Sequence, residues 1–142
     1  MVQHLICPKC SQKFILKYSK KKSNEILEGN LICSKNHRFF IKGGIPRLVV
    51  DKEKTFVKTE DSFSSKWRNY NKTYHTKKWF DGQKKWFLER FGWKTSANFN
   101  KFLKTRNKIL DAGTGIGNSA KLFSSNPKAD VFAIDASESV SF

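Results

Sequence analysis

Three cysteines and a histidine near the N-terminus have the residue types and the spacing of metal ligands. Cys7 and Cys10 form a C-x-x-C pair, and after a gap of 22 residues Cys33 and His37 form a C-x-x-x-H pair. Two thiolates separated by two residues can reach one ion from a tight turn, and a second turn can complete a tetrahedron of three sulfurs and one nitrogen. Zinc suits this set because it binds both sulfur and nitrogen and has no geometric preference of its own. Four protein ligands leave no open position, so the sequence predicts a structural zinc site.

Two alternatives to this ligand set stay open at the level of the sequence. His4, three residues before Cys7, could replace His37 as the fourth ligand, and the cysteines could be free thiols without a metal. A redox-active pair is less favoured, because no strand–helix–strand pattern surrounds Cys7 and Cys10. An odd cysteine count with a C-x-x-C pair favours a reducing compartment over a disulfide framework, and we expect a cytoplasmic protein.

A second candidate site lies near the C-terminus, where Asp111 precedes Gly113, Gly115 and Gly117. Glycines let a backbone turn sharply and approach a ligand closely. The helix expected to follow directs its free N–H groups at the same place. Residues 115–120 also satisfy the G-x-G-x-x-A pattern of dinucleotide-binding proteins in a shifted register. The pattern therefore predicts a cradle for a nucleoside cofactor, of which two classes are possible.

Asp111 favours one of these two cofactor classes. A carboxylate two residues before the first glycine would repel the pyrophosphate of a dinucleotide. S-adenosylmethionine has no phosphate and carries a sulfonium and an ammonium group, which a nearby carboxylate does not repel. The sequence therefore favours S-adenosylmethionine, with a dinucleotide as the alternative.

The elements that must position the four metal ligands are expected to be short strands. Polar residues 19–24 are expected to form a loop, and Gly29–Asn30 a turn. A hairpin is expected around Gly43–Gly44. The predicted strands cover residues 14–18, 26–32, 38–42 and 46–50.

Residues 51–107 are expected to connect the two sites. Residues 51–58 are charged, lack periodicity and are typical of a linker. The aromatic residues from Trp79 to Phe91 fit one face of a helix, in which Asp81–Gly82 is either an early break or the start. The tryptophans could stack on bases, but at helical spacing a core role is favoured. His75 could act as a general base, although an exposed histidine is the favoured interpretation. Beyond the connector, we expect strands at 109–110 and 131–134 and a helix at 118–123.

The charge is unevenly distributed. Residues 1–58 and 59–108 each hold 13 Lys and Arg against 4 Asp and Glu, whereas residues 109–142 hold 2 against 4. A basic field outside the cofactor region could attract RNA, DNA or an anionic membrane surface, and the alternative is a solvated lysine-rich surface. No apolar run approaches 18 residues and the first residues lack the pattern of a signal peptide, so the sequence predicts no membrane-spanning segment and no secretion signal.

The N-terminal motifs resemble a known module. The Cys7–Cys10 and Cys33–His37 pairs, followed by Gly-Gly-Ile-Pro-Arg-Leu at 43–48, resemble the small zinc-ribbon-like module found beside methyltransferases. One version is a separate activator subunit of tRNA, rRNA and protein methyltransferases. Another is fused to the N-terminus of bacterial large-subunit rRNA guanine methyltransferases, with a shorter gap between the two pairs. The resemblance implies a module over residues 1–50 with zinc held by these four residues.

The C-terminal motif resembles the first motif of class I S-adenosylmethionine-dependent methyltransferases. Matched position by position, Asp111, Gly113, Gly115 and Gly117 take the places of the motif's acid and glycines. Asp135 matches the acid at the end of the second strand, where the resemblance implies hydrogen bonds to both ribose hydroxyls. Thr114 and Ala136, beside these positions, complete the expected cofactor-binding set.

Together the residues and the resemblance predict an α/β chain. It has a β-rich zinc-ribbon-like module at 1–50, a linker and aromatic helical connector at 51–107, and at 108–142 the first β-α-β of a Rossmann-like methyltransferase domain. We expect this domain to be incomplete and the chain alone to be inactive, and no catalytic residue can be named. The expected function is methyl transfer from S-adenosylmethionine to an RNA or a small molecule. The alternative is a zinc-dependent RNA-binding or adaptor module without catalysis.

Overall fold

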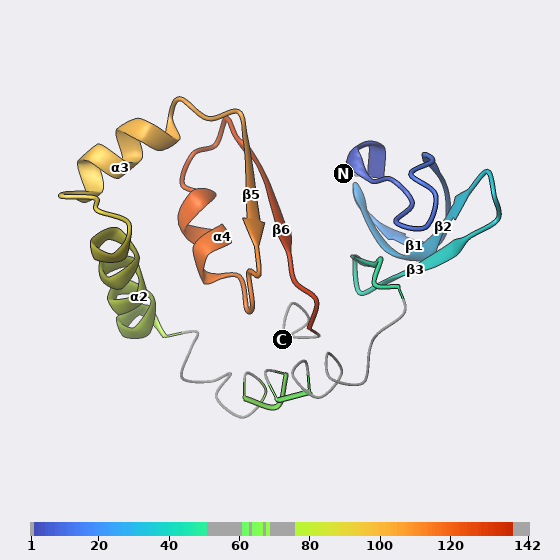
Figure 1. The fold of residues 1–142 in the computed structure, drawn as a ribbon, viewed down its shortest axis with the longest axis horizontal. Coiled ribbons are helices and arrows are strands. Elements are labelled where there is room, and N and C mark those ends of the chain that lie inside the picture. Colours follow the sequence, from blue (N-terminus) through green and yellow to red (C-terminus); the bar gives the residue numbers. More distant parts are fainter. Residues whose placement is uncertain (1, 51–60, 63, 67, 69–75, 138–142) are drawn as a thin grey trace. The chain divides into compact units, whose positions relative to one another are not determined.

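A computed structural model describes residues 2–50, 61, 62, 64–66, 68 and 76–137, and the chain forms two compact units, Met1–Lys54 and Thr55–Phe142 (Figure 1). The linker expected at 51–58 lies outside the described residues. So do His75 and the aromatic residues at positions 63, 67, 70 and 74. The two units are described separately below.

The first unit is built on a four-stranded antiparallel sheet with strand order β1-β2-β3-β4. A 3-10 turn, η1 (Val2–His4), precedes the sheet. The expected hairpin around Gly43–Gly44 is confirmed, because Lys42 pairs with Ile45 across this two-residue turn. The strands are β1 (Phe14–Lys22), β2 (Glu25–Cys33), β3 (Arg38–Lys42) and β4 (Ile45–Arg47).

Three expectations about this sheet are wrong. The strand expected at 46–50 begins at Ile45 and ends at Arg47. Residues 19–24 do not form a loop, because β1 continues to Lys22 and the turn contains only Ser23 and Asn24. Lysines are tolerated in this strand because both of its faces are exposed beyond Leu16. Gly29–Asn30 is not a turn but lies inside β2.

Gly29 is needed for strand packing rather than for a turn. It pairs with Tyr18 on one side and with Ile41 on the other. A Cβ atom at this position would lie 2.7 Å from the carbonyl oxygen of Lys17 and 3.1 Å from the Cα atom of Tyr18. The pairing of β1 with β2 also shifts register just beyond Tyr18. Glycine therefore allows β1 to approach β2 closely where the irregular pairing begins.

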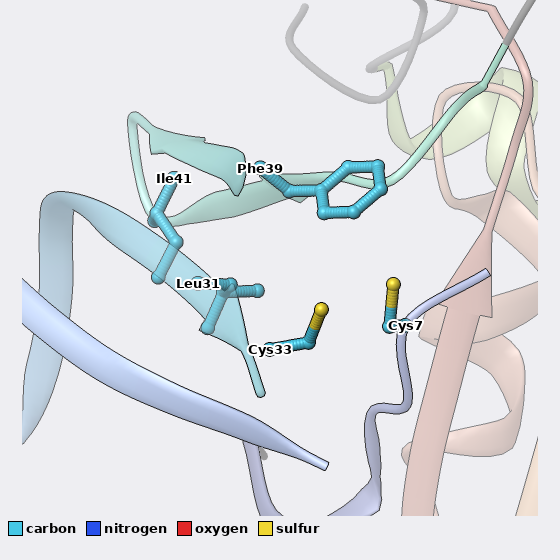
Figure 2. Packing of buried hydrophobic residues seen from close by; sticks show 5 residues of the cluster. All are labelled: Cys7, Leu31, Cys33, Phe39 and Ile41. Carbon is cyan, nitrogen blue, oxygen red and sulfur yellow. The ribbon is translucent and has the colours of Figure 1, made fainter. Parts of the chain in front are cut away.

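The core of the first unit lies on one face of the sheet. Burial alternates along β3, where Phe39 and Ile41 are buried and their neighbours are exposed. These two side chains and Leu31 of β2 pack with Cys7 and Cys33 (Figure 2). The hydrophobic core and the candidate metal ligands therefore belong to one cluster.

Between residues 76 and 137, which the structure describes without a gap, the second unit contains three helices and two parallel strands. The pairs run from Lys108↔Asp130 to Ala112↔Ile134. The helix expected at 118–123 is confirmed, and the strands expected at 109–110 and 131–134 are three residues and one residue longer than predicted. The elements are α2 (Lys77–Arg90), α3 (Ser96–Leu103), β5 (Lys108–Ala112), α4 (Asn118–Phe123) and β6 (Asp130–Ile134).

Helices α2, α3 and α4 share one apolar cluster. Its buried members are Leu88, Phe99, Leu103 and Leu122, and Phe87 packs edge-on against Phe99 with ring centroids 5.7 Å apart. Some aromatic residues of the connector therefore contribute to a core, as their spacing predicted, among them Phe87, Trp93 and Phe99.

Not all aromatic residues of the connector join that core. Trp86 and Phe91 are exposed. Asp81 and Gly82 lie inside α2 and neither begin nor break it. The helix begins instead at Lys77, and the side chain of the preceding Thr76 caps it by accepting a hydrogen bond from the backbone N–H of Trp79.

Asn126 joins the helices to the strands. Its buried side-chain amide donates hydrogen bonds to the carbonyl oxygens of Leu103 and Arg106, at 2.7 and 3.0 Å. Its oxygen accepts a bond from the N–H of Lys128. One side chain thus connects the end of α3 with the segment between α4 and β6. A buried amide with all these partners satisfied stabilises the packing around it.

The strand pair has one exposed apolar face. Ile109 packs against the helical cluster, whereas Leu110 and Ile134 are exposed among the described residues.

Within the part of the chain that the structure describes, no helix combines the length and the apolar composition that crossing a lipid bilayer requires.

The close approach at Gly29 leads to a prediction about stability. We expect Gly29→Ala to destabilise the first unit by about 1–3 kcal/mol, because the added methyl group meets backbone atoms that must shift. The measurement is native-state amide hydrogen exchange across β1, β2 and β3.

The matched control is Gly82→Ala on α2, where an added Cβ would meet nothing within 4 Å. We expect it to slow exchange in α2, because alanine stabilises a helix interior by about 0.5–1 kcal/mol relative to glycine. Unchanged exchange in β2 of the Gly29 variant would show that the strands do not approach each other as described.

Candidate metal centre and glycine loop

A tight turn presents the first pair of candidate metal ligands. Cys7 donates its N–H to the carbonyl oxygen of Gln12 at 2.8 Å, and its own carbonyl accepts from the N–H groups of Cys10 and Ser11. Ser11 has a φ of 57°, in the left-handed region that a short polar residue can adopt. This local network brings the two sulfurs to one side of the turn.

A second turn between β2 and β3 presents the other pair. Cys33 is the last residue of β2 and His37 directly precedes β3. Their backbones are joined by a bond of 3.1 Å from the Cys33 N–H to the His37 carbonyl, and Asn36 donates to the Cys33 carbonyl at 2.9 Å. Asn36 takes the left-handed conformation with a φ of 59°. The hairpin turn itself therefore places both ligands.

The two turns bring the four ligand atoms together. These atoms all lie within 4.8 Å of one another. The Nδ1 atom of His37 is 3.5 Å from the Cys7 sulfur and 3.4 Å from the Cys33 sulfur. The sulfurs of Cys10 and Cys33 are 3.6 Å apart. With metal–sulfur bonds of about 2.3 Å, the edges of a regular tetrahedron would be about 3.8 Å long, close to these separations.

Burial and hydrogen bonding make the thiols unequal. Cys7 is 0% and Cys33 is 2% exposed. Burial raises the pKa of Cys10, and its hydrogen bonds to the Cys7 and Cys33 thiols raise it further. Burial also acts to raise the pKa of Cys33, but hydrogen bonds from the backbone of His37 and the thiol of Cys10 outweigh it and lower the pKa. The Cys33 thiol therefore ionises more readily than that of Cys10.

Of the two candidate histidines, the structure brings His37 to the cysteines. His37 belongs to the cluster of ligand atoms, whereas His4 is exposed and its ring contacts the side chain of Gln3 at 3.3 Å. Figure 2 shows the sulfurs of Cys7 and Cys33 beside the apolar residues of the core. Cys7, Cys10, Cys33 and His37 could hold a metal ion such as zinc.

The glycine loop after β5 has the conformation that its sequence requires. Gly113, Gly115 and Gly117 have φ values of 82°, 57° and 85°, which residues with a Cβ atom rarely adopt. A Cβ atom on Gly113 or on Gly117 would meet nothing within 4 Å, so the space beside these two positions is open. The N–H groups of Gly113 and Thr114 both donate to the carbonyl of Ile134 at the end of β6. The loop is thereby attached to the neighbouring strand.

Asp135 fastens the same loop through its side chain. One carboxylate oxygen accepts a bond of 2.7 Å from the N–H of Gly115, and the other accepts from the N–H and the hydroxyl of Ser137 at 2.8 and 2.6 Å. Burial acts to raise the pKa of Asp135, but the bonds from Ser137, Gly115 and Ala136 outweigh it and lower the pKa. The carboxylate is therefore ionised at neutral pH and points at the loop.

The remaining residues expected at the cofactor site surround this loop. The hydroxyl of Thr114 donates to a carboxylate oxygen of Asp111 at 2.6 Å, which closes the turn at the end of β5. Ala136 is exposed next to Asp135.

The roles of Ser137 and Asn126 were not predicted from the sequence. Ser137 could have been found from the Asp-x-Ser pattern, because an aspartate side chain often accepts bonds from the residue two positions on. The partners of Asn126 lie 20 and 23 residues away along the chain, and no local pattern indicates them.

Comparison with known proteins does not place this chain in a family. No protein-family model matches the sequence, and no curated protein matches it.

The geometry of the metal centre leads to a prediction about metal content. We expect the purified chain to bind about one zinc ion, and Cys10→Ala and His37→Ala each to reduce the zinc retained after gel filtration to a small fraction. Removing zinc with a chelator should abolish amide protection in β1, β2 and β3, because the ligands connect two turns of this small unit. Metal analysis by mass spectrometry and hydrogen exchange are the measurements.

The matched control is His4→Ala, which removes the other nearby imidazole. It should retain full zinc content, because His4 lies outside the ligand cluster. A loss of zinc in this variant together with full zinc in His37→Ala would contradict the assignment.

Proposed function

We propose that the chain belongs to an S-adenosylmethionine-dependent methyltransferase, in which zinc holds the first unit together and the second unit binds the cofactor. One observation carries the proposal. An ionised carboxylate at the end of β6, that of Asp135, lies beside a glycine loop at the end of the parallel strand β5. Ligands of α/β proteins bind outside the carboxyl ends of parallel strands.

The chemistry of this loop favours a nucleoside that carries no phosphate. Asp111, two residues before Gly113, would repel a pyrophosphate at the start of the loop. An acid at the position of Asp135 can bond to the ribose in either cofactor class, so Asp111 is the residue that distinguishes the two classes. A carboxylate oxygen has two lone pairs, and the oxygen of Asp135 that accepts from Gly115 has one more to offer. A ribose hydroxyl could donate to it without breaking the bond that shapes the loop.

The ionised state of Asp135 supports its proposed role as the acceptor for a ribose hydroxyl. A hydrogen bond to a charged acceptor is shorter and stronger than one between neutral groups. The bonds that lower its pKa also hold the carboxylate in one orientation, so little ordering would be needed when a ligand binds. The open space beside Gly113 and Gly117 would let the nucleoside approach the backbone.

Methyl transfer needs little covalent chemistry from the protein. The cofactor supplies a methyl group that is activated by a sulfonium. The contribution of the chain would be to bind the nucleoside and to hold donor and acceptor in line, because positioning supplies much of the rate enhancement of such bimolecular reactions. The acceptor is an RNA or a small molecule.

The proposal predicts a specific pattern of cofactor binding. Isothermal titration calorimetry with S-adenosylhomocysteine should show binding to the chain. Asp135→Asn should weaken it roughly tenfold to a hundredfold, because a hydrogen bond to a charged group contributes about 1.5–3 kcal/mol. NAD⁺, titrated in parallel, should bind more weakly.

The matched control is Asp130→Asn, which removes an exposed carboxylate at the other end of β6. Its affinity should equal that of the original chain. Absence of S-adenosylhomocysteine binding by a chain whose Gly115 amide is protected from exchange would refute the methyltransferase proposal and favour an adaptor without catalysis. Tighter binding of NAD⁺ would favour a dinucleotide enzyme.

A further inference from the structure

The outer face of the four-stranded sheet presents an exposed aromatic ring among cations. Successive side chains of a strand point to opposite faces. On β3, Phe39 and Ile41 are buried in the core, so Arg38, Phe40 and Lys42 lie on the other face. Phe40 is 64% exposed and Phe39 only 6%. The ring of Phe40 therefore does not contribute to the core of this unit.

The strand register determines the neighbours of Phe40. Asn30 of β2 lies directly opposite Phe40, and Lys17 of β1 lies opposite Asn30. On its other side Phe40 pairs with Arg47 of β4. Directly opposite side chains have Cβ atoms about 4.5–5.5 Å apart. A row of four side chains therefore crosses the whole sheet, from Lys17 through Asn30 and Phe40 to Arg47.

Two more cations lie next to this row along β3. Arg38 and Lys42 are two residues before and after Phe40 and are exposed. The carboxylate of Glu28 lies opposite Lys42 on the same face. We name this surface the basic face and define it by Lys17, Asn30, Arg38, Phe40, Lys42 and Arg47.

The charge of this face matches a polyanion. It carries four cations, and residues 1–50 hold 10 Lys and Arg against 2 Asp and Glu. Such an excess of positive charge attracts phosphates and accelerates their association. The exposed ring of Phe40 adds a surface on which a base can stack, because every base has a flat face that can stack on an aromatic side chain. Charged side chains alone do not provide such a surface.

We propose that the basic face binds single-stranded RNA, with one base stacked on Phe40 and phosphates next to Lys17, Arg38 and Lys42. Bases in a duplex are stacked on each other and are not available to a ring on a flat sheet, so the partner is single-stranded. Asn30 offers both a donor and an acceptor beside Phe40, and these can bond to the 2′-hydroxyl that distinguishes RNA from DNA.

The arrangement of the apolar side chains argues against a membrane as the partner. Ile15 is as exposed as Phe40 and lies opposite Ile32, but Lys17 and Asn30 occupy the next positions of the same two strands on this face. The four positions directly beside Phe40, which are Arg38, Lys42, Asn30 and Arg47, are likewise polar, and the apolar Ile32 and Ile45 lie only diagonally from it. Binding at a lipid interface depends on the area of apolar surface that is buried, and these side chains do not form such a continuous area.

The basic face would let the proposed methyltransferase hold an RNA acceptor. In this respect the inference rests on the proposed function and specifies its acceptor as RNA. The binding itself involves only the first unit and needs no cofactor. We therefore test it without S-adenosylmethionine, so that a failure here and a failure of cofactor binding can be told apart.

The test is fluorescence anisotropy with the full chain, loaded with zinc, and a labelled single-stranded RNA of twelve nucleotides without self-complementarity. Phe40→Leu keeps an apolar side chain but removes the ring, and we expect about a tenfold loss of affinity with an unchanged salt dependence. Phe40→Tyr should restore the affinity. Lys17→Ala combined with Arg38→Ala should make the slope of log K against log salt shallower by about 1.4.

Two matched controls exclude effects on folding and on net charge. Tyr18→Leu removes a ring that is 58% exposed but belongs by register to the other face of the sheet, and it should not change the affinity. Lys9→Ala combined with Lys35→Ala also removes two cations, one from each ligand turn, and should change the salt slope less than the Lys17 and Arg38 double variant.

Four results would overturn the proposal. They are absence of RNA binding, equal losses in the Phe40→Leu and Tyr18→Leu variants, equal affinity for a duplex or for DNA of the same sequence, and Phe40-dependent binding to vesicles of phosphatidylserine that exceeds binding to RNA.

Discussion

The first unit depends on one spatial constraint: three sulfur atoms and one ring nitrogen from two turns must meet within 4.8 Å. The buried cluster around them is small, and two of its five buried members, Cys7 and Cys33, are themselves candidate ligands. A unit of this size buries a smaller fraction of its surface on folding than a large domain does, and natural units of this size often add a metal or disulfides. Bonds from one ion to both turns would supply the stability that the small core cannot.

The same constraint also positions the outer face of the sheet. Cys33 ends β2 and His37 directly precedes β3, so the turn that holds these two ligands sets the register between the strands. In that register Asn30 lies opposite Phe40. The metal centre and the basic face are thus two consequences of one hairpin. In the second unit the carboxylate of Asp135 likewise fixes the position of a candidate site, because its hydrogen bond to Gly115 holds the glycine loop against the end of β6.

The sequence predicted the parts of the structure that depend on local spacing. The C-x-x-C and C-x-x-x-H pairs gave the ligand cluster, and the glycines at 113, 115 and 117 gave a loop of positive φ angles. Prediction from the sequence failed where the pairing with a distant strand determines the conformation. Gly29 resembles a turn residue in the sequence, but it lies inside β2 because the backbone of Lys17 approaches it. The choice between His4 and His37 likewise needed the pairing of β2 with β3.

Zinc K-edge X-ray absorption spectroscopy of the purified full chain tests the central claim most directly. The account predicts a first coordination shell of three sulfur atoms at about 2.3 Å and one nitrogen at about 2.0–2.1 Å. A shell made of oxygen and nitrogen alone, or a chain that purifies without any bound metal and keeps its N-terminal sheet, would contradict the account.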